Sequence, residues 1–262
     1  MKTKKVHLAS ENAEIFLFGR PKNWKDDFRN HQEIFPILKE KGITNIYLPD
    51  PTDFNGLLCK PADFKKEDKF NNINLFEECK AEGIVIPKNS GMFICTADCP
   101  TIVFHDIEND MLIAAHAGFG SVVDKTKITT DKPSRNHEGV VEEIMKKIKN
   151  TSMYEIHILC GISYNNFRYD INHFMHGETN KKIFDYLLKE YGDNAVPRGM
   201  EHGGISVPGI IKEQFICYGV DLDKITSDGI DTYADKDWWS HHRSINLEGK
   251  KCGRNGILIL HK

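Results

Sequence analysis

The sequence predicts a single α/β domain of the α+β type, a mixed β-sheet sandwich flanked by helices. Runs rich in β-branched and aromatic residues outnumber the segments with helical periodicity. These runs come in clusters rather than in strict strand–helix alternation, which favours a mixed sheet or sandwich with helices packed outside it. The chain has 262 residues and no internal repeat or long linker, so it can bury one full core but is too short for two large domains.

Strands are expected where apolar, β-branched and aromatic residues alternate or run continuously, and helices where apolar residues recur at helical spacing. The polar segment between Val122 and Glu138 has no period and is expected to be an excursion on the surface. In chain order, the expected strands are Lys5–Ala9, Ala13–Gly19, Thr44–Leu48, Gly83–Pro87, Met92–Thr96, Pro100–Asp106, Met111–Ala117, Glu155–Gly161 and Gly256–His261. The expected helices are His31–Lys41, Gly139–Lys149, Lys181–Tyr191 and Val207–Tyr218.

The composition excludes several classes of function. A net charge of −3 provides no basic field, so neither nucleic acid nor a membrane is an expected partner. No apolar run approaches the roughly 20 residues of a membrane helix, and the first residues lack a cleavable signal, so a cytoplasmic location is expected. The 7 cysteines are an odd number without a CxxC pair, which indicates free thiols in a reducing compartment.

The most informative stretch is the segment 91–120, where apolar runs are interrupted by small and polar residues. Cys99 lies at a strand break, and His116 closes the apolar run that precedes Ala117 and Gly118. A thiolate activated by an imidazole is a nucleophile, whereas a thiolate together with imidazoles is a zinc site. The spacing of the two residues does not distinguish these roles.

Four ordered motifs resemble those of the YfiH family, the "laccase-domain" or polyphenol oxidase proteins, which include a purine nucleoside phosphorylase and adenosine deaminase branch. The similarity covers 82–262, with 1–80 as a divergent N-terminal part of the same domain. The first motif is a two-part signature, TADCP (96–100) followed by AAHAGF (114–119). The other three are GISYNNFRYDI (161–171), WWSHHR (238–243) and GRNGILIL (253–260).

The resemblance implies a zinc-dependent purine nucleoside enzyme that carries out phosphorolysis, adenosine deamination or both, with Cys99 and His116 as metal ligands. The first family ligand, a histidine, has no counterpart in 45–56, so Asp50 or Asp53 replaces it or the site holds no metal. The resemblance also implies substrate-binding roles at the following positions: Tyr169 and Asp170 in the pocket wall, and Arg243 and Arg254 as a clamp for an anion such as phosphate.

Two alternatives remain open at this stage. One is a metal-free hydrolase or deamidase in which His116 activates Cys99, with Asp98 or Asp170 orienting the imidazole. The other is a catalytically inactive, nucleoside-binding relative. Copper oxidation is rejected because a multicopper oxidase needs histidines organised largely as His-x-His pairs, and the 12 histidines of this chain form none.

Four further histidines are expected to lie outside the site or at its edge. His241 and His242 are adjacent, so on a strand they would face opposite ways, with one of them at the surface or a cleft. His173 and His176 have a helical spacing that suits a metal, but without a nearby third ligand they are expected at the surface.

Overall fold

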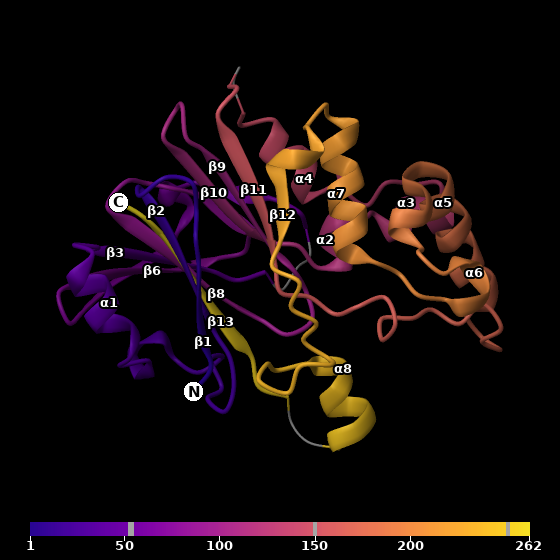
Figure 1. Cartoon of the computed structure of the whole chain (residues 1–262), viewed down its shortest axis with the longest axis horizontal. Coiled ribbons are helices and arrows are strands. Elements are labelled where there is room, and N and C mark those ends of the chain that lie inside the picture. Colours follow the sequence, from indigo (N-terminus) through magenta and orange to yellow (C-terminus); the bar gives the residue numbers. More distant parts are fainter. Residues whose placement is uncertain (52–54, 149–150, 250–251) are drawn as a thin grey trace.

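A computed structural model describes residues 1–51, 55–148, 151–249 and 252–262, and shows two mixed β-sheets packed face to face with helices outside them (Figure 1). The predicted single α/β domain is confirmed. In the described part of the chain, the strands form one sheet of seven and one of six.

The first sheet is antiparallel except at one strand. β3, which lies near its middle, pairs in parallel with both of its neighbours, β8 and β6. In sheet order the strands are β1 (Thr3–Val6), β2 (Ala13–Phe18), β13 (Asn255–His261), β8 (Ser90–Thr96), β3 (Asn45–Pro49), β6 (Ile73–Cys79) and β5 (Lys66–Phe70).

The second sheet has an antiparallel centre and a parallel strand at each edge, because β12 pairs in parallel with β11, and β4 with β7. In sheet order the strands are β12 (Ile225–Ser227), β11 (Tyr154–Leu159), β9 (Thr101–Asp106), β10 (Met111–His116), β7 (Gly83–Ile86) and β4 (Leu58–Cys59).

The helices lie outside the two sheets (Figure 1). They are α1 (Ile34–Glu40), α2 (Phe119–Val122), α3 (Lys125–Thr130), α4 (Val140–Met145), α5 (Gly177–Ala195), α6 (Gly199–His202), α7 (Val207–Cys217) and α8 (His241–Arg243), with short 3₁₀ turns at Phe28–Asn30, Pro61–Asp63 and Leu222–Lys224 and a π turn at Ser244–Glu248.

Three apolar clusters make up the core, one between the sheets and one on each outer face. β13 shows how one strand serves two of them: Ile257 and Ile259 point into the space between the sheets, while Leu258 and Leu260 pack on the α1 side. Side chains alternate between the faces of a strand, so a strand buried on both faces is apolar throughout.

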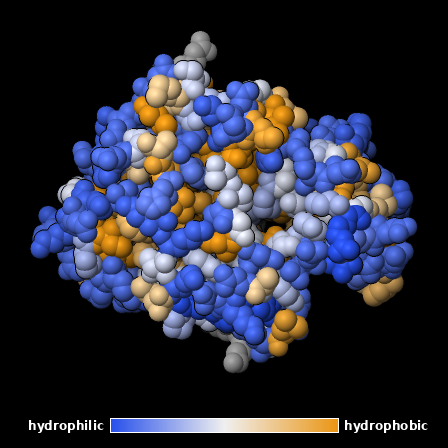
Figure 2. All heavy atoms as spheres, viewed as in Figure 1, coloured by the Kyte–Doolittle hydropathy of each residue, from blue (hydrophilic) through white to orange (hydrophobic). Residues whose placement is uncertain are grey.

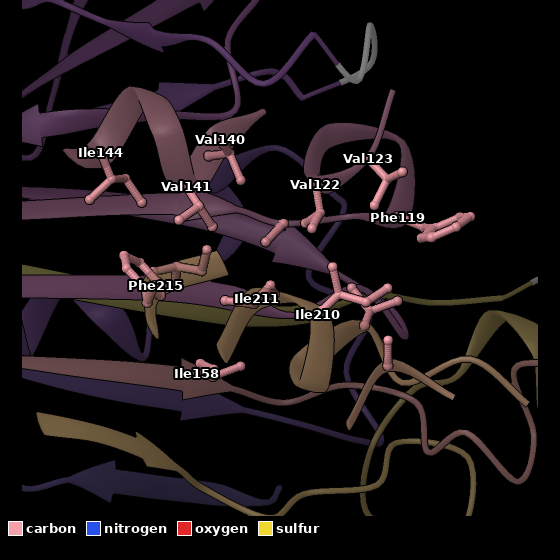
Figure 3. Close-up of a cluster of buried hydrophobic side chains, with 14 of the residues drawn as sticks. Phe119, Val122, Val123, Val140, Val141, Ile144, Ile158, Ile210, Ile211 and Phe215 are labelled. Carbon is pink, nitrogen blue, oxygen red and sulfur yellow. The ribbon is translucent and has the colours of Figure 1, made fainter. Parts of the chain in front are cut away.

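The third cluster joins the outer face of the second sheet to the helices. Figure 3 shows Ile158 of β11 packed below α2, α4 and α7, whose side chains interlock above the strand. The cluster includes Phe119, Val122, Val140, Val141, Ile144, Ile210, Ile211 and Phe215. This packing fixes α2, and with it the turn that follows β10.

The nine expected strands and four expected helices are confirmed, with ends shifted by a few residues; the predicted end at Lys149 lies outside the described residues. Four strands, β4, β5, β6 and β12, were not predicted from the sequence. The segment between Val122 and Glu138, predicted to be irregular, contains α3, which Asp124 caps by accepting from Lys127 N at 3.1 Å. β5, with the sequence KEDKF, is a charged edge strand without an apolar pattern.

The surface is mainly hydrophilic on the face in Figure 2, with hydrophobic side chains in small separate groups. Among the described residues, none of the helices has the length and apolar character that crossing a membrane requires. The seven cysteines are all free thiols.

Candidate active site

The ends of neighbouring strands bring Cys99 and His116 together. His116, the last residue of β10, lies opposite Thr101, the first residue of β9, and Cys99 is two positions before that strand. Two hydrogen bonds hold the turn: Ala117 N donates to Pro100 O at 2.8 Å, and Thr96 Oγ1 donates to Cys99 O at 2.6 Å.

Asp98, next to Cys99, has a left-handed backbone conformation with a φ of 80°. Few residues other than glycine adopt this region, and those that do are often near functional sites. Asp98 turns its carboxylate toward α8, whereas Cys99 lines a cavity.

Glu82 holds the ring of His116. Its Oε2 accepts a hydrogen bond from His116 Nδ1 at 2.7 Å, and its backbone oxygen accepts one from His116 N at 2.8 Å. The Glu82 side chain is fully buried, and its Oε1 has no hydrogen-bond partner in the described part of the chain. Because Nδ1 is bound to this carboxylate, Nε2 is the ring atom left to act on Cys99.

The charge of His116 follows from these neighbours. Burial lowers the pKa of the ring, but Coulombic attraction by Cys99 and hydrogen bonds with Cys99 and Glu82 outweigh burial and raise the pKa of His116 to about 10. The imidazolium of His116 therefore carries a proton on each ring nitrogen and lies beside the Cys99 sulfur.

A cavity of about 630 Å³ opens at this pair, within the usual size range of small-molecule pockets. Its walls carry both charges, with Lys25 and Arg254 as cations facing several carboxylates. The lining residues include Cys99, His116, His241, Cys95, Asp26, Asp27, Asp50, Glu77, Phe28 and Phe93.

The structure places only some of the residues suggested by the sequence in this cavity. Arg254 and Asp50 line it together with Cys99 and His116. Asp53 lies outside the described residues. Tyr169 and Asp170 line a different cavity.

The carboxylate that orients His116 is Glu82 rather than Asp98 or Asp170. Asp98 Oδ2 accepts hydrogen bonds from His242 N at 2.8 Å and His242 Nδ1 at 2.9 Å, so this carboxylate is already engaged. The Asp170 side chain is exposed and accepts from Asn172 N at 2.8 Å.

Arg243 does not act as an anion clamp, because every nitrogen of its buried guanidinium has a protein acceptor. Nε donates to Glu248 at 3.2 Å, Nη2 donates to Trp238 O, and Nη1 donates to three backbone carbonyls. Those carbonyls belong to Thr232, Tyr233 and Asp235, at 2.7 to 3.1 Å. Arg243 therefore stabilises the loop before α8.

Sequence reasoning missed Glu82 and His241 as members of the site. Glu82 is a single carboxylate immediately before the apolar run of β7, which is a weak signal. For His241 and His242 the sequence indicated only that one of them contacts the surface or a cleft. Ser240 Oγ accepts a hydrogen bond from Arg243 N at 3.1 Å and starts α8, which places His241 in the cavity of Cys99.

The donors at this cavity in the described part of the chain do not make up a complete zinc site. Among residues 1–51, 55–148, 151–249 and 252–262, no three histidine, cysteine, aspartate or glutamate side chains converge as metal ligands. Cys99 and His116 supply two donors, whereas catalytic zinc sites normally use three protein ligands.

Comparisons with known proteins agree with the resemblance seen in the motifs. A family model described as "Multi-copper polyphenol oxidoreductase laccase" matches residues 76–262. No curated protein matches the sequence.

Three solved structures show the same fold. Hypothetical protein YfiH of Bacillus licheniformis has 17% identity and a TM-score of 0.65, with 95% of this chain and 92% of that chain covered. Protein NMB0706 of Neisseria meningitidis, from family DUF152, has 14% identity and a TM-score of 0.65, with 99% of each chain covered. YlmD of Geobacillus stearothermophilus has 13% identity and a TM-score of 0.64, with 96% and 93% covered. These structures confirm the predicted fold, and the match to the family model confirms the predicted family.

Proposed function

The chain belongs to the family of multi-copper polyphenol oxidoreductase laccases, and within that family we propose that it is a metal-independent thiol hydrolase acting on an acyl bond of a small molecule. The observation that carries this proposal is the arrangement of Cys99, His116 and Glu82, in which His116 lies between the other two at a cavity of about 630 Å³. Copper oxidation is not part of it, because the sequence has no His-x-His pair.

Each of these three residues has a distinct role in hydrolysis. The Cys99 sulfur attacks the carbonyl carbon of an amide or ester; the bond to the leaving group breaks, and His116 gives that group its proton. A thioester on Cys99 results. Water then gives a proton to His116 and adds to the thioester carbon, after which the acid leaves and Cys99 departs with the electron pair. Glu82 holds the ring in place and stabilises its positive charge.

A purine nucleoside activity that depends on zinc is the second candidate. Family membership favours it, and Asp50, which lines the cavity of Cys99, is available as an oxygen ligand. The free thiols support a reducing, cytoplasmic location under either candidate.

The test pairs two cysteines that line one cavity. Burial raises the pKa of Cys95 to about 12, and its sulfur donates to Trp24 O at 2.8 Å, so Cys95 is a matched control for Cys99. With p-nitrophenyl acetate as the substrate, we expect Cys99→Ser to reduce kcat/KM by about 10³-fold or more, and Cys95→Ser to leave it within about twofold. Equal activity of the wild type and Cys99→Ser would refute the proposal.

Metal analysis and a nucleoside screen separate the two candidates. The hydrolase is expected to be purified without zinc and to keep its activity in a chelator. About one zinc per chain, together with turnover of adenosine, inosine or methylthioadenosine with or without phosphate, would favour the nucleoside enzyme instead. No turnover of any substrate and an unreactive Cys99 would identify an inactive binding relative.

A further inference from the structure

A second cavity, of about 640 Å³, lies beside α8. Its walls come from α3, from the loop that leads into α5, from the first turns of α5, and from His242. The adjacent residue His241 lines the cavity of Cys99, so neighbouring side chains of one short helix serve different cavities. Figure 1 shows α3 and α5 side by side in the part of the molecule that contains this wall.

His242 is fixed in one orientation. The buried carboxylate of Asp98 accepts from His242 N at 2.8 Å and from Nδ1 at 2.9 Å through the same oxygen, while its other oxygen accepts from Thr232 Oγ1 at 2.7 Å. Phe167 packs edge-on against the ring, with a centroid distance of 5.6 Å. With Nδ1 donating to Asp98, Nε2 is the ring nitrogen available to a ligand.

The charges around this cavity are predominantly positive. Lys125 and Arg168 are exposed cations in its wall, and His173 and His176 add two imidazoles to that of His242. Asp170 is the one carboxylate among its lining residues, and Asn172 N already donates to it.

Backbone hydrogen bonds to Nδ1 of His173 leave Nε2 as the donor of this ring. Its Nδ1 accepts from Met175 N and from His176 N, each at 3.2 Å, so the proton of a neutral ring is on Nε2. The cavity therefore combines two exposed cations with imidazoles held by the backbone and by a buried carboxylate. One of these cations, Arg168, also donates from Nε to His202 O at 2.8 Å.

We propose that this second cavity binds a phosphate group, with His242, Lys125 and Arg168 as its main contacts. Guanidinium, ammonium and imidazole donors arranged around one space suit the three exposed oxygens of a phosphate. The aromatic walls at Phe167 and Tyr169 also suit the base of a nucleotide that carries such a phosphate. This site is independent of the chemistry proposed at Cys99.

The phosphate can come from the free ion or from a phosphomonoester, and binding measurements distinguish these sources. Isothermal titration calorimetry with inorganic phosphate, AMP and adenosine is the direct experiment. Binding of inorganic phosphate and AMP with similar affinity indicates a site for the ion alone, and tighter binding of AMP indicates a nucleotide site. Both results support a phosphate site. Equal binding of adenosine and AMP would overturn it, as would no binding of phosphate and AMP.

Variants locate the binding. His242→Asn keeps a donor toward Asp98 but removes Nε2, and we expect it to weaken binding by about tenfold or more, which is the usual contribution of one charge-assisted hydrogen bond. His241→Asn is the matched control on the same helix and is expected to change affinity by less than about twofold. The exposed changes Lys125→Met and Arg168→Gln test the same site without disturbing the core.

The Cys99→Ser variant distinguishes the proposed hydrolase from the proposed phosphate site. It removes the nucleophile of the hydrolase, and we expect its affinity for phosphate to equal that of the wild type. Wild-type affinity in both Lys125→Met and Arg168→Gln would overturn the site. A similar loss in His241→Asn and His242→Asn would also overturn it, since the binding would then not depend on Nε2 of His242.

Discussion

Glu82→Gln is the substitution that tests the role of the buried carboxylate beneath His116. The change keeps the size of the side chain and removes its charge. Glu82 is fully buried, and its Oε2 accepts from Nδ1 at 2.7 Å, so the bond is short and shielded from water. A hydrogen bond of this kind to a charged group contributes about 1.5–3 kcal/mol, which corresponds to a factor of roughly 10–150.

We therefore expect Glu82→Gln to lower kcat by about 10- to 150-fold with p-nitrophenyl acetate. KM should stay nearly constant, because Glu82 acts through His116 and does not contact the substrate. Thermal unfolding checks that the variant is folded, and Glu82→Asp, which keeps the charge on a shorter side chain, should recover part of the rate. An unchanged kcat, or a loss that appears in KM alone, would refute the reasoning.

Three further predictions concern stability and metal content. Burial raises the pKa of Glu155, but hydrogen bonds from His105, His157 and a backbone N–H outweigh burial and lower this pKa to about 2. The lowered pKa contributes about 3 kcal/mol to the free energy of unfolding above pH 4.5, and this contribution is lost as the pH falls toward 2. Urea unfolding of Glu155→Gln should accordingly show a smaller loss of stability over that pH range, and an unaltered acid dependence would exclude Glu155 as the source. Arg243→Lys should destabilise the fold by about 2–4 kcal/mol in chemical denaturation, because one ammonium cannot satisfy the acceptors that the buried guanidinium binds. A change below about 0.5 kcal/mol would contradict the structural role of Arg243. Addition and removal of zinc should leave the melting temperature unchanged, whereas a stabilisation that Cys99→Ser abolishes would show that the metal binds at the site.

The site's central pair could be predicted from the sequence because local patterns mark it. Cys99 and His116 both lie where apolar runs stop beside small residues, and strand ends that meet at one sheet edge bring such residues together. Glu82 could not be predicted in the same way. Its position beside His116 depends on the pairing of β7 with β10, in which Gly83 lies opposite Ala115, and such a register is a long-range property of the fold.

The two arginines show a second limit. Arg243 and Arg254 belong to neighbouring motifs and have the same chemistry, yet one is buried among carbonyls and the other lines the cavity of Cys99. Burial of a guanidinium depends on the path of the loop around it, which composition does not reveal. The histidines of α8 show the same limit, because their placement depends on one capping hydrogen bond, which Ser240 Oγ accepts from Arg243 N.

More of the fold than of the site could be predicted from the sequence. Strands such as β13 are apolar on both faces and are recognisable without knowledge of their neighbours. The missed strands are short or charged, and pairing with an existing sheet gives them their structure. β4, for example, has only two residues and forms by parallel pairing with β7.

An NMR titration of the His116 ring, assigned by comparison with a His116→Gln variant, tests the central claim most directly. The structure predicts a ring that is doubly protonated at neutral pH and loses a proton only near pH 10, because Cys99 and Glu82 both stabilise its charge. A ring that titrates near its ordinary pKa of 6.5 in the wild type, as it would without those two partners, would contradict the proposed nucleophilic site.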